Sequence, residues 1–262
     1  MDIIVCVKHV PEVAEVDLRI DESGRDIEKT GLVFDINEWD DYAVEEAIRI
    51  KEEYGGSVTV VTVGSEDSDR TLRRCLAKGA DRAIRVTDRR IVASDPFIVA
   101  KVLSKVIKKM TFDLVLTGAQ SSDYGYAFVG PALSSLLGIP HTTLVKKIVI
   151  KDGRVVVNRE LEGGLEEVVE IKLPAVLTIQ TGINEPRYVS IMGIKKAMKK
   201  ELRVLTLDDL GLSVDEVGVE SSWIQIEEMY IPSIERRVEL IRGSPEEVAS
   251  KIVEIIKGRG LL

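Results

Sequence analysis

The chain has 262 residues, of which 45% are hydrophobic and 31% charged, and its 36 basic and 44 acidic side chains give a formal net charge of -8. This length predicts between one and two domains, and the composition is that of a globular protein with a substantial core. The acidic balance argues against nucleic-acid binding. Two cysteines and two histidines offer too few ligands for a disulfide framework or a Cys/His zinc site, so we expect neither a disulfide nor a metal.

The sequence also predicts where the protein works. No apolar run approaches the ~20 residues that would span a bilayer. The chain starts directly with a strand-like run and lacks a charged leader with a cleavage site. We therefore expect a cytoplasmic protein that is not itself inserted in a membrane.

Strand-like and helix-like segments alternate four times in residues 1–140. Short β-branched apolar runs predict strands, and longer segments with apolar residues at helical spacing predict helices. In chain order they are strand 3–8, helix 38–54, strand 58–63, a helix after Ser65 that ends at Gly79, strand 83–86, a helix that begins at Ser94, strand 113–117 and helix 127–137. Crossovers of this length imply parallel strands, so the pattern predicts a doubly wound, mostly parallel α/β sheet with helices on both faces.

The second half of the chain has a different pattern. Residues 145–150 and 154–160 flank a turn and predict a small antiparallel sheet, and 167–172 and 175–180 also have extended character. After Gly211 the chain is irregular until Ser244, where Ser-Pro-Glu-Glu predicts a capping box and a final helix. The apolar stripe of that helix can pack on the chain's own core or on a partner, and the pattern leaves both open.

The loop after the fourth predicted strand, residues 117–131, is the strongest candidate for a ligand site. In an open α/β sheet, ligands bind at the carboxyl ends of the strands, where a helix N-terminus offers free N–H groups to an anion. The glycines of the loop permit close backbone approach and its serines add hydroxyl donors. These residues are Gly118, Gly125, Gly130, Ser121 and Ser122.

The chemistry of this loop limits what it can do. Its spacing is neither G-x-G-x-x-G nor a Walker loop, and no lysine lies between Gly118 and Pro131. Hydrolysis of a triphosphate would normally need that lysine and a magnesium ligand. We therefore expect a phosphate that is bound and not cleaved, with an ordinary strand-to-helix turn as the alternative interpretation.

The other polar residues favour structural roles. Cys6 lies in a buried strand, and Cys75 lies on an apolar helix face, so both are interpreted as inert core residues. The acidic pairs 40–41 and 45–46 are interpreted as solvated helix charge. Neither a Ser/His/Asp nor a Cys/His arrangement stands out, which favours a nucleotide-binding protein that is not an enzyme.

Taken together, these motifs resemble the beta subunit of electron transfer flavoprotein. The most specific match is the segment 157–178 followed by Asn-Glu-Pro-Arg-Tyr at 184–188. The other matching segments are 5–10 (VCVKHV), 35–47, 75–82 and 195–197. The resemblance covers nearly the whole chain, and the combination of 37–41 with 120–123 looks most like the branch that serves trimethylamine-type dehydrogenases.

This resemblance implies an electron carrier subunit without substrate turnover. It implies an alpha subunit that holds most of the FAD, flavoprotein dehydrogenases as electron donors, and an acceptor such as a membrane quinone oxidoreductase. It also implies that the chain itself holds a structural AMP. The cofactor-binding residues expected from the loop and the resemblance are Cys6, Asn37, Glu38, Trp39, Asp40, Val63, Gly118, Gln120, Ser121, Ser122, Asp123, Tyr124, Gly125, Tyr126, Ala127, Phe128, Val129, Gly130, Pro131, Ala132, Leu133 and Ser134.

The resemblance also assigns a partner-docking segment to residues 188–194. Its expected contacts are Tyr188, Ile191, Met192 and Ile194, with Ile191 where many members of the family present a leucine. We expect two units, an α/β nucleotide-binding domain over 1–211 that includes the hairpin and the docking segment, and a C-terminal arm over 212–262 whose helix packs on the alpha subunit.

Two alternatives remain at this point. A bifurcating flavoprotein would bind a second FAD in place of AMP, but its loop tends to read Gln-Ala-Ile-Asp-Gly-Asp, from which residues 121–128 depart. A nucleotide-sensing α/β module would have a similar topology and would work without a flavin.

Overall fold

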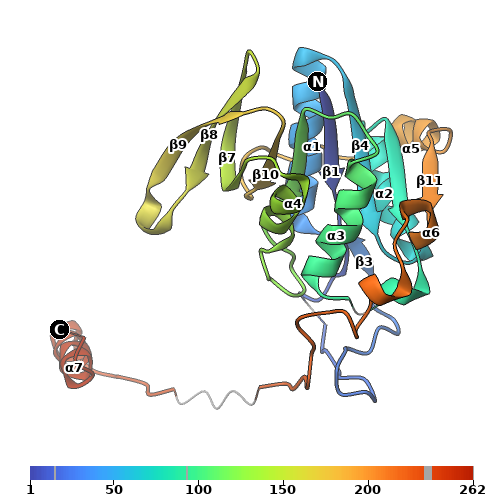
Figure 1. Ribbon diagram of the computed structural model, residues 1–262. Helices are drawn as coiled ribbons and strands as arrows, with labels where there is room; N and C mark the ends of the chain where they lie inside the picture. Colours follow the sequence, from blue (N-terminus) through green and yellow to red (C-terminus); the bar gives the residue numbers. More distant parts are fainter. Residues whose placement is uncertain (15, 93, 233–237, 262) are drawn as a thin grey trace.

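The computed structural model describes residues 1–14, 16–92, 94–232 and 238–261. Within these ranges, nine strands form one sheet whose parallel part has helices on both faces (Figure 1). They are β1 (Asp2–Cys6), β4 (Ser57–Val63), β5 (Arg82–Val86), β6 (Leu114–Gly118), β7 (His141–Lys151), β8 (Arg154–Glu160), β9 (Glu166–Lys172), β10 (Ala175–Ile179) and β11 (Leu202–Leu205). A separate antiparallel pair consists of β2 (His9–Pro11) and β3 (Phe34–Ile36). The predicted α/β class is confirmed.

The order of the strands determines where a ligand can bind. It is β11-β5-β4-β1-β6-β10-β7-β8-β9, with parallel pairing from β11 to β7 and antiparallel pairing of β7 with β8 and of β8 with β9. From β1 the chain moves outward to β4 and β5 and then returns to β6, on the other side of β1. Open α/β sheets bind ligands at the carboxyl ends of strands where the order reverses in this way. The topology therefore singles out the ends of β1 and β6, at Cys6 and Gly118.

The side chains of the buried strands point alternately to the two faces of the sheet and form two apolar cores, one on each face. Ile3 and Val5 of β1 belong to one core, whereas Ile4 and Cys6 belong to the other. The first core is covered by α1 (Glu38–Tyr54), α2 (Asp69–Lys78) and α5 (Ile191–Ala197). The second is covered by α3 (Pro96–Ile107), α4 (Val129–Leu137) and α6 (Leu207–Leu210). Short 3₁₀ turns lie at Glu66–Ser68, Arg89–Ile91, Glu162–Gly164 and Val214–Glu216.

Most predicted elements lie where the pattern placed them, with three corrections. The helix expected from Ser94 begins at Pro96, because the Asp95 side chain accepts the Ile98 N–H at 2.8 Å and caps it. The hairpin of β7 and β8 extends the main sheet and is not a sheet of its own. β10 lies between β6 and β7 in parallel register, so the extended segment that follows the hairpin belongs to the centre of the fold.

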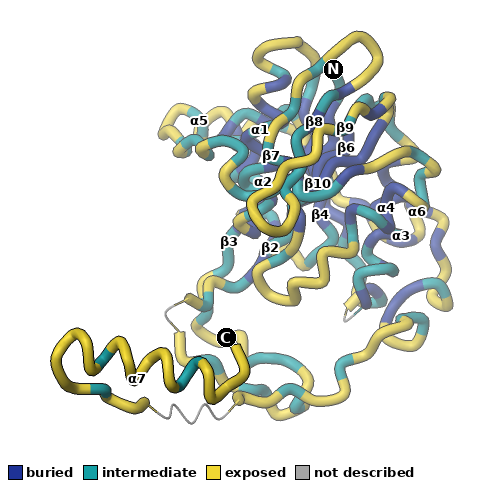
Figure 2. The backbone as a smooth tube through the Cα atoms, turned by 90° about the vertical axis from the view of Figure 1, so that its left-hand side faces the viewer, coloured by how far each residue is buried: buried dark blue, intermediate teal, exposed yellow. Residues whose placement is uncertain are grey.

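The C-terminal helix α7 (Pro245–Gly258) has the predicted capping box. Ser244 accepts the Glu247 N–H at 3.3 Å, and the Glu247 carboxylate accepts the Ser244 N–H at 2.8 Å. This helix lies apart from the α/β body, and none of its residues is buried (Figures 1 and 2). Residues 233–237 and Leu262 of the expected C-terminal unit lie outside the described residues. Among the helices in the described ranges, none is long and apolar enough to cross a membrane.

Candidate functional site

The reversal of the strand order places a crevice at the ends of β1 and β6, and a buried carboxylate joins the two chain segments there. Asp40, in the first turn of α1, is only 5% exposed. Its Oδ1 accepts the Gly118 N–H at 2.9 Å, and its Oδ2 accepts the Lys8 N–H at 2.7 Å. The chain leaving β1 and the chain leaving β6 are therefore both bonded to the start of α1.

Asn37, which immediately precedes α1, holds the loop that follows β6. Its side-chain Nδ2 donates to the Gln120 carbonyl at 2.8 Å, and its Oδ1 accepts the Ser122 N–H at 3.0 Å. An amide side chain can make both contacts at once because it carries a donor and an acceptor. Residues 37–40 and 118–123, which the sequence predicted to share one site, are thus in direct contact.

A lysine that the sequence argument did not assign to the site completes it. Lys8 Nζ lies 2.7 Å from Asp123 Oδ1, 3.5 Å from Ser121 Oγ and 4.7 Å from the centre of the Tyr124 ring. The loop after β6 contains no lysine of its own, but β1 delivers one from the neighbouring strand. The available signal was the position of Lys8, two residues beyond the end of β1 and beside the point where the strand order reverses.

Three aromatic side chains give the outer part of the loop an exposed apolar surface. Tyr124, Tyr126 and Phe128 are each more than 40% exposed, and the two tyrosine rings stack at 5.7 Å with 8° between their planes. They lie just before α4, whose N-cap Phe128 makes no side-chain cap hydrogen bond, so that the N–H groups of Val129 and Gly130 are the ones that a helix start would offer to an anion. This arrangement offers flat surfaces for a planar ring beside donors for a phosphate.

The glycines at the two ends of the loop serve protein packing. A Cβ on Gly118 would lie 2.4 Å from Asp40 Oδ1, and a Cβ on Gly130 would lie 2.3 Å from Thr178 Cγ2. Gly125 instead has φ +62 and open space around it, as a turn requires. The backbone at Gly118 and Gly130 therefore lies close to neighbouring elements of the fold. The sequence pattern predicted instead that these glycines let the backbone approach a ligand.

Several predicted site residues are buried and contribute to the packing around the crevice. Leu133 is buried in the core, and Ser134 Oγ donates to the Ile139 carbonyl at 2.6 Å. Cys6 is a free thiol that is buried as predicted, and burial together with the Asp40 charge raises its pKa. Val63, half-buried, ends the neighbouring strand β4. The exposed part of the predicted set consists of Glu38, Gln120, Ser122, Asp123, Tyr124, Gly125, Tyr126, Ala127 and Phe128. Its half-buried or buried remainder includes Trp39, Ser121, Val129, Pro131 and Ala132.

The expectation that the acidic pairs of α1 are solvated is wrong for Asp40 and Glu45. Burial raises the pKa of Asp40 to about 7, against the opposing effect of the backbone hydrogen bonds from Lys8 and Gly118. Glu45 is 2% exposed and is bonded to Arg187. A charge is buried only where partners compensate it, and these partners come from residues far away in sequence.

The expected docking residues are all exposed. Tyr188 is 98% exposed, Ile191 74%, Met192 63% and Ile194 52%. Ile191 opens α5, which Ser190 caps by accepting the Gly193 N–H at 3.0 Å. These four side chains form an apolar patch of the kind found at interaction sites.

The donor set at the crevice fits a single phosphate and an aromatic ring. Backbone N–H groups at the start of α4, the hydroxyl of Ser121 and the ammonium of Lys8 are donors that bind phosphate oxygens. This chain offers fewer free hydrogen-bonding groups to a flavin. The Trp39 indole N–H, for example, already donates to Gln180 Oε1 at 2.8 Å. Among the residues with described positions, no group of three or more His, Cys, Asp or Glu side chains is placed to bind a metal.

The fold and this crevice define a doubly wound α/β protein, and comparison with known proteins gives its family. Residues 26–210 match the electron transfer flavoprotein domain. Electron transfer flavoprotein subunit beta of Methylophilus methylotrophus is 45% identical over 260 residues, 98% of either chain, and that of Thermoanaerobacterium thermosaccharolyticum is 40% identical over the full length of both. Subunit CarD of the caffeyl-CoA reductase-Etf complex of Acetobacterium woodii is 35% identical over 265 residues, the full length of both. The chain therefore belongs to the electron transfer flavoprotein beta subunit family, as its motifs predicted. Membership implies a role in electron transfer, association with a flavin and an alpha-subunit partner.

Proposed function

We propose that this chain is the beta subunit of a heterodimeric electron transfer flavoprotein that binds AMP in the crevice between β1 and β6. The observation that carries the proposal is the convergence of Asn37, Asp40 and Lys8 on the loop after β6. Three segments far apart in sequence are fixed there, beside hydrogen-bond donors that could bind a phosphate and beside exposed aromatic rings.

In this proposal AMP has a structural role. One phosphate suits a site with a helix N-terminus, hydroxyl groups and one lysine. Lys8 is paired with Asp123, and the loop after β6 has no lysine of its own of the kind that a triphosphate-hydrolysing loop normally carries. The nucleotide would tie the ends of β1 and β6 to α4.

The flavin is proposed to be FAD, bound mainly by the alpha subunit and partly enclosed by this chain. Bound FAD supplies the redox chemistry, accepting and releasing electrons. From this chain, Trp39 lies at the crevice with its indole fixed by Gln180. The proposed units are the α/β body over 1–211 and the arm over 212–262, whose exposed Trp223, Ile224 and Ile231 and helix α7 would pack on the alpha subunit.

The docking segment 188–194 is proposed to receive flavoprotein dehydrogenases. Its apolar patch offers Ile191 as an anchor that a hydrophobic pocket on the dehydrogenase can bury. Electrons would then pass to a downstream acceptor such as a membrane quinone oxidoreductase. The heterodimer is proposed to work in the cytoplasm, where its two buried cysteines would stay reduced.

A bifurcating flavoprotein with a second FAD in place of AMP is the second candidate function. The stacked, exposed rings of Tyr124 and Tyr126 favour it, because they could also cover a flavin ring. The relative named as part of a caffeyl-CoA reductase-Etf complex is a further reason to test it. Membership of the family counts against a nucleotide-sensing module without a flavin.

Co-expression with an alpha subunit tests the proposed function. The heterodimer should be yellow and should be reduced by a flavoprotein dehydrogenase, whereas this chain alone should purify without tightly bound flavin. A colourless heterodimer, or no complex with alpha, would favour the sensing module. Stoichiometric FAD on the isolated chain would count against a flavin held mainly by alpha.

A further inference from the structure

The first residues of the docking segment, residues 188–194, have little packing beneath them. A cavity of 550 Å³ lies between them and α2, and the segment meets α2 further along, at Gly193. Arg73, Arg74 and Ala77 of α2 line the cavity on one side, and Tyr188 and Ile194 line it on the other. Because this space is open, the course of the segment depends on its contacts with α1 before it and with α2 at its far end.

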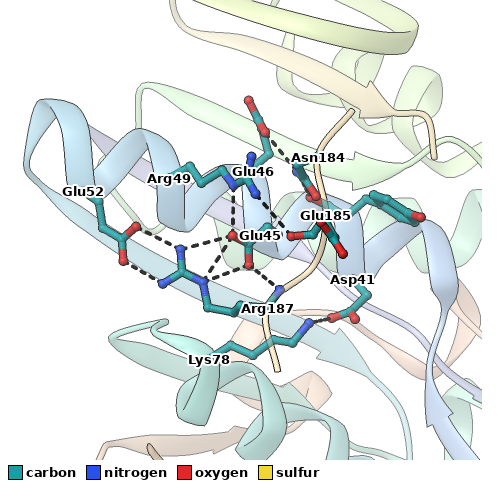
Figure 3. A network of polar contacts seen from close by, with 10 residues as sticks. Asp41, Glu45, Glu46, Arg49, Glu52, Lys78, Asn184, Glu185 and Arg187 are labelled. Atoms are coloured by element: carbon teal, nitrogen blue, oxygen red, sulfur yellow. Dashed lines mark hydrogen bonds and ion pairs between the residues drawn. The ribbon is translucent and has the colours of Figure 1, made fainter. Parts of the chain in front are cut away.

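The contact at the N-terminal end is an arginine clamp on α1 (Figure 3). The buried carboxylate of Glu45 accepts the backbone N–H of Arg187 at 3.1 Å and its side-chain Nε–H at 2.9 Å. The guanidinium also donates to both carboxylate oxygens of Glu52, at 2.7 and 2.9 Å. Glu45 and Glu52 are seven residues apart, so one face of α1 binds Arg187 from both sides. The next residue, Tyr188, is almost fully exposed.

Neighbouring residues extend the clamp along the same helix. Arg49 Nε donates to Glu45 at 3.0 Å, and its Nη2 donates to the Glu185 carbonyl at 3.2 Å. Asn184 Nδ2 donates to Glu46 at 2.9 Å. Residues 184, 185 and 187 are therefore each bonded to α1 just before the docking segment begins (Figure 3).

The contact at the C-terminal end lies on α2. Arg73 Nη1 donates to the carbonyls of Ala197 and Lys200, at 2.7 and 2.9 Å. A Cβ on Gly193 would lie 2.5 Å from the Ala77 carbonyl oxygen, so α5 touches α2 at that glycine. The docking segment thus runs between two fixed points, the arginine clamp on α1 and the contacts with α2.

We propose that Glu45 and Arg187 are positioning residues for partner recognition: their ion pair fixes the direction in which the chain leaves α1, and thereby the way Ile191 and Met192 are presented. This inference rests on the proposed docking function of residues 188–194. A forked, charge-assisted pair suits such a role because it fixes angle as well as distance. Burial opposes ionisation of Glu45, but the hydrogen bonds from Arg187 and Arg49 outweigh it and hold its pKa below the usual range.

Hydrogen exchange of the full chain tests the positioning itself. Glu45→Gln keeps the shape of the side chain and removes its charge, and Arg187→Lys keeps the charge and removes the fork. Both variants should exchange the amides of residues 190–198 about 10- to 100-fold faster, with β1 and β6 unchanged. Glu53→Gln is the matched control, since Glu53 is exposed on the same helix and makes none of the contacts of the clamp. Unchanged exchange in both clamp variants would overturn the proposal.

Steady-state kinetics of the heterodimer then test the consequence for docking. With a flavoprotein dehydrogenase that reduces the wild-type heterodimer, Glu45→Gln and Arg187→Lys should raise KM for the heterodimer about 5- to 50-fold and leave kcat and the flavin spectrum unchanged. Ile191→Ala distinguishes the docking assignment of residues 188–194 from the positioning role of the clamp. If it raises KM while the clamp variants do not, docking is correct and the positioning proposal fails. If it leaves KM unchanged, the docking assignment fails, and the recognition role of the clamp fails with it.

Discussion

Lys8 Nζ lies 2.7 Å from Asp123 Oδ1, and this ion pair joins the chain beyond β1 to the loop beyond β6. It places a cation within reach of a loop that contains no lysine between Gly118 and Pro131. Asp40, buried between the same two chain segments, binds the backbone N–H groups of both. The charged part of the crevice is therefore built by residues from three segments, around positions 8, 40 and 118–123.

Replacing Lys8 by methionine should weaken AMP binding. The change removes one charge-assisted hydrogen bond to a phosphate, so the Kd of the nucleotide-free heterodimer for AMP should rise about 10- to 100-fold in calorimetric titration. Lys172→Met is the control, because Lys172 is exposed on the edge strand β9, at the far end of the sheet from β1 and β6. Equal affinity in wild type and Lys8→Met would remove Lys8 from the site.

The buried Asp40 should make stability depend on pH. Its pKa rises from about 4 in the unfolded chain to about 7 in the folded one, so folding takes up a proton between these values. The contribution is fully present below pH ~4 and is lost as the pH rises through about 7. Urea unfolding should give a drop of about 2–3 kcal/mol between pH 5 and 8 that Asp40→Asn lacks. Parallel pH profiles of the two proteins would show that Asp40 ionises normally.

The ion pair of Lys78 with Asp41 should behave as a buried one. The Lys78 side chain is 1% exposed and Asp41 is its partner. Asp41→Asn leaves that charge uncompensated and should cost about 3–5 kcal/mol in unfolding free energy, of which most should return when Lys78→Met is added. Asp26→Asn, in a surface pair, should change stability by less than about 1 kcal/mol. A double variant no more stable than Asp41→Asn alone would contradict this account.

Ile191→Ala should slow reduction by a dehydrogenase without changing the flavin spectrum. Loss of an apolar anchor removes about 1–3 kcal/mol of binding free energy, which corresponds to a roughly 5- to 150-fold loss of affinity. Transfer rates measured at sub-saturating dehydrogenase report this loss. Val168→Ala is the control, since Val168 is also exposed but lies on β9, outside the docking segment and the C-terminal arm. Identical rates for Ile191→Ala and wild type would contradict the docking assignment.

The local elements could be predicted from the sequence because their signals are local. The spacing of Ala43, Ala47 and Ile50 predicts α1, and Ser244 with Glu247 predicts the start of α7. The position of β10 could not be predicted, because its pairing with β6 and β7 joins segments far apart in the chain. The same holds for the buried state of Asp40 and Glu45. An isolated helix pattern shows their charge but not the Gly118 and Arg187 groups that compensate it.

The position of the candidate crevice could be predicted from the sequence, but its charged contacts could not. Gly118 and Asn37 follow and precede recognisable elements, so their meeting at the strand ends is a consequence of the α/β pattern. Lys8 was missed because it follows β1, whereas the loop that it contacts follows β6. That β1 and β6 are neighbours is a property of the folded sheet and is not visible in the sequence. The clamp of Arg187 on α1 was missed because its partners, Glu45 and Glu52, lie about two turns apart on another helix, which no spacing within 184–188 reveals.

The nucleotide content of the purified heterodimer tests the central claim most directly. The protein is denatured, and the released nucleotides are separated by chromatography and quantified against the protein. A phosphate held by Lys8, Ser121 and the start of α4 predicts one AMP and one FAD for each heterodimer. Two FAD and no AMP would contradict the proposed site and would make this chain part of a bifurcating flavoprotein.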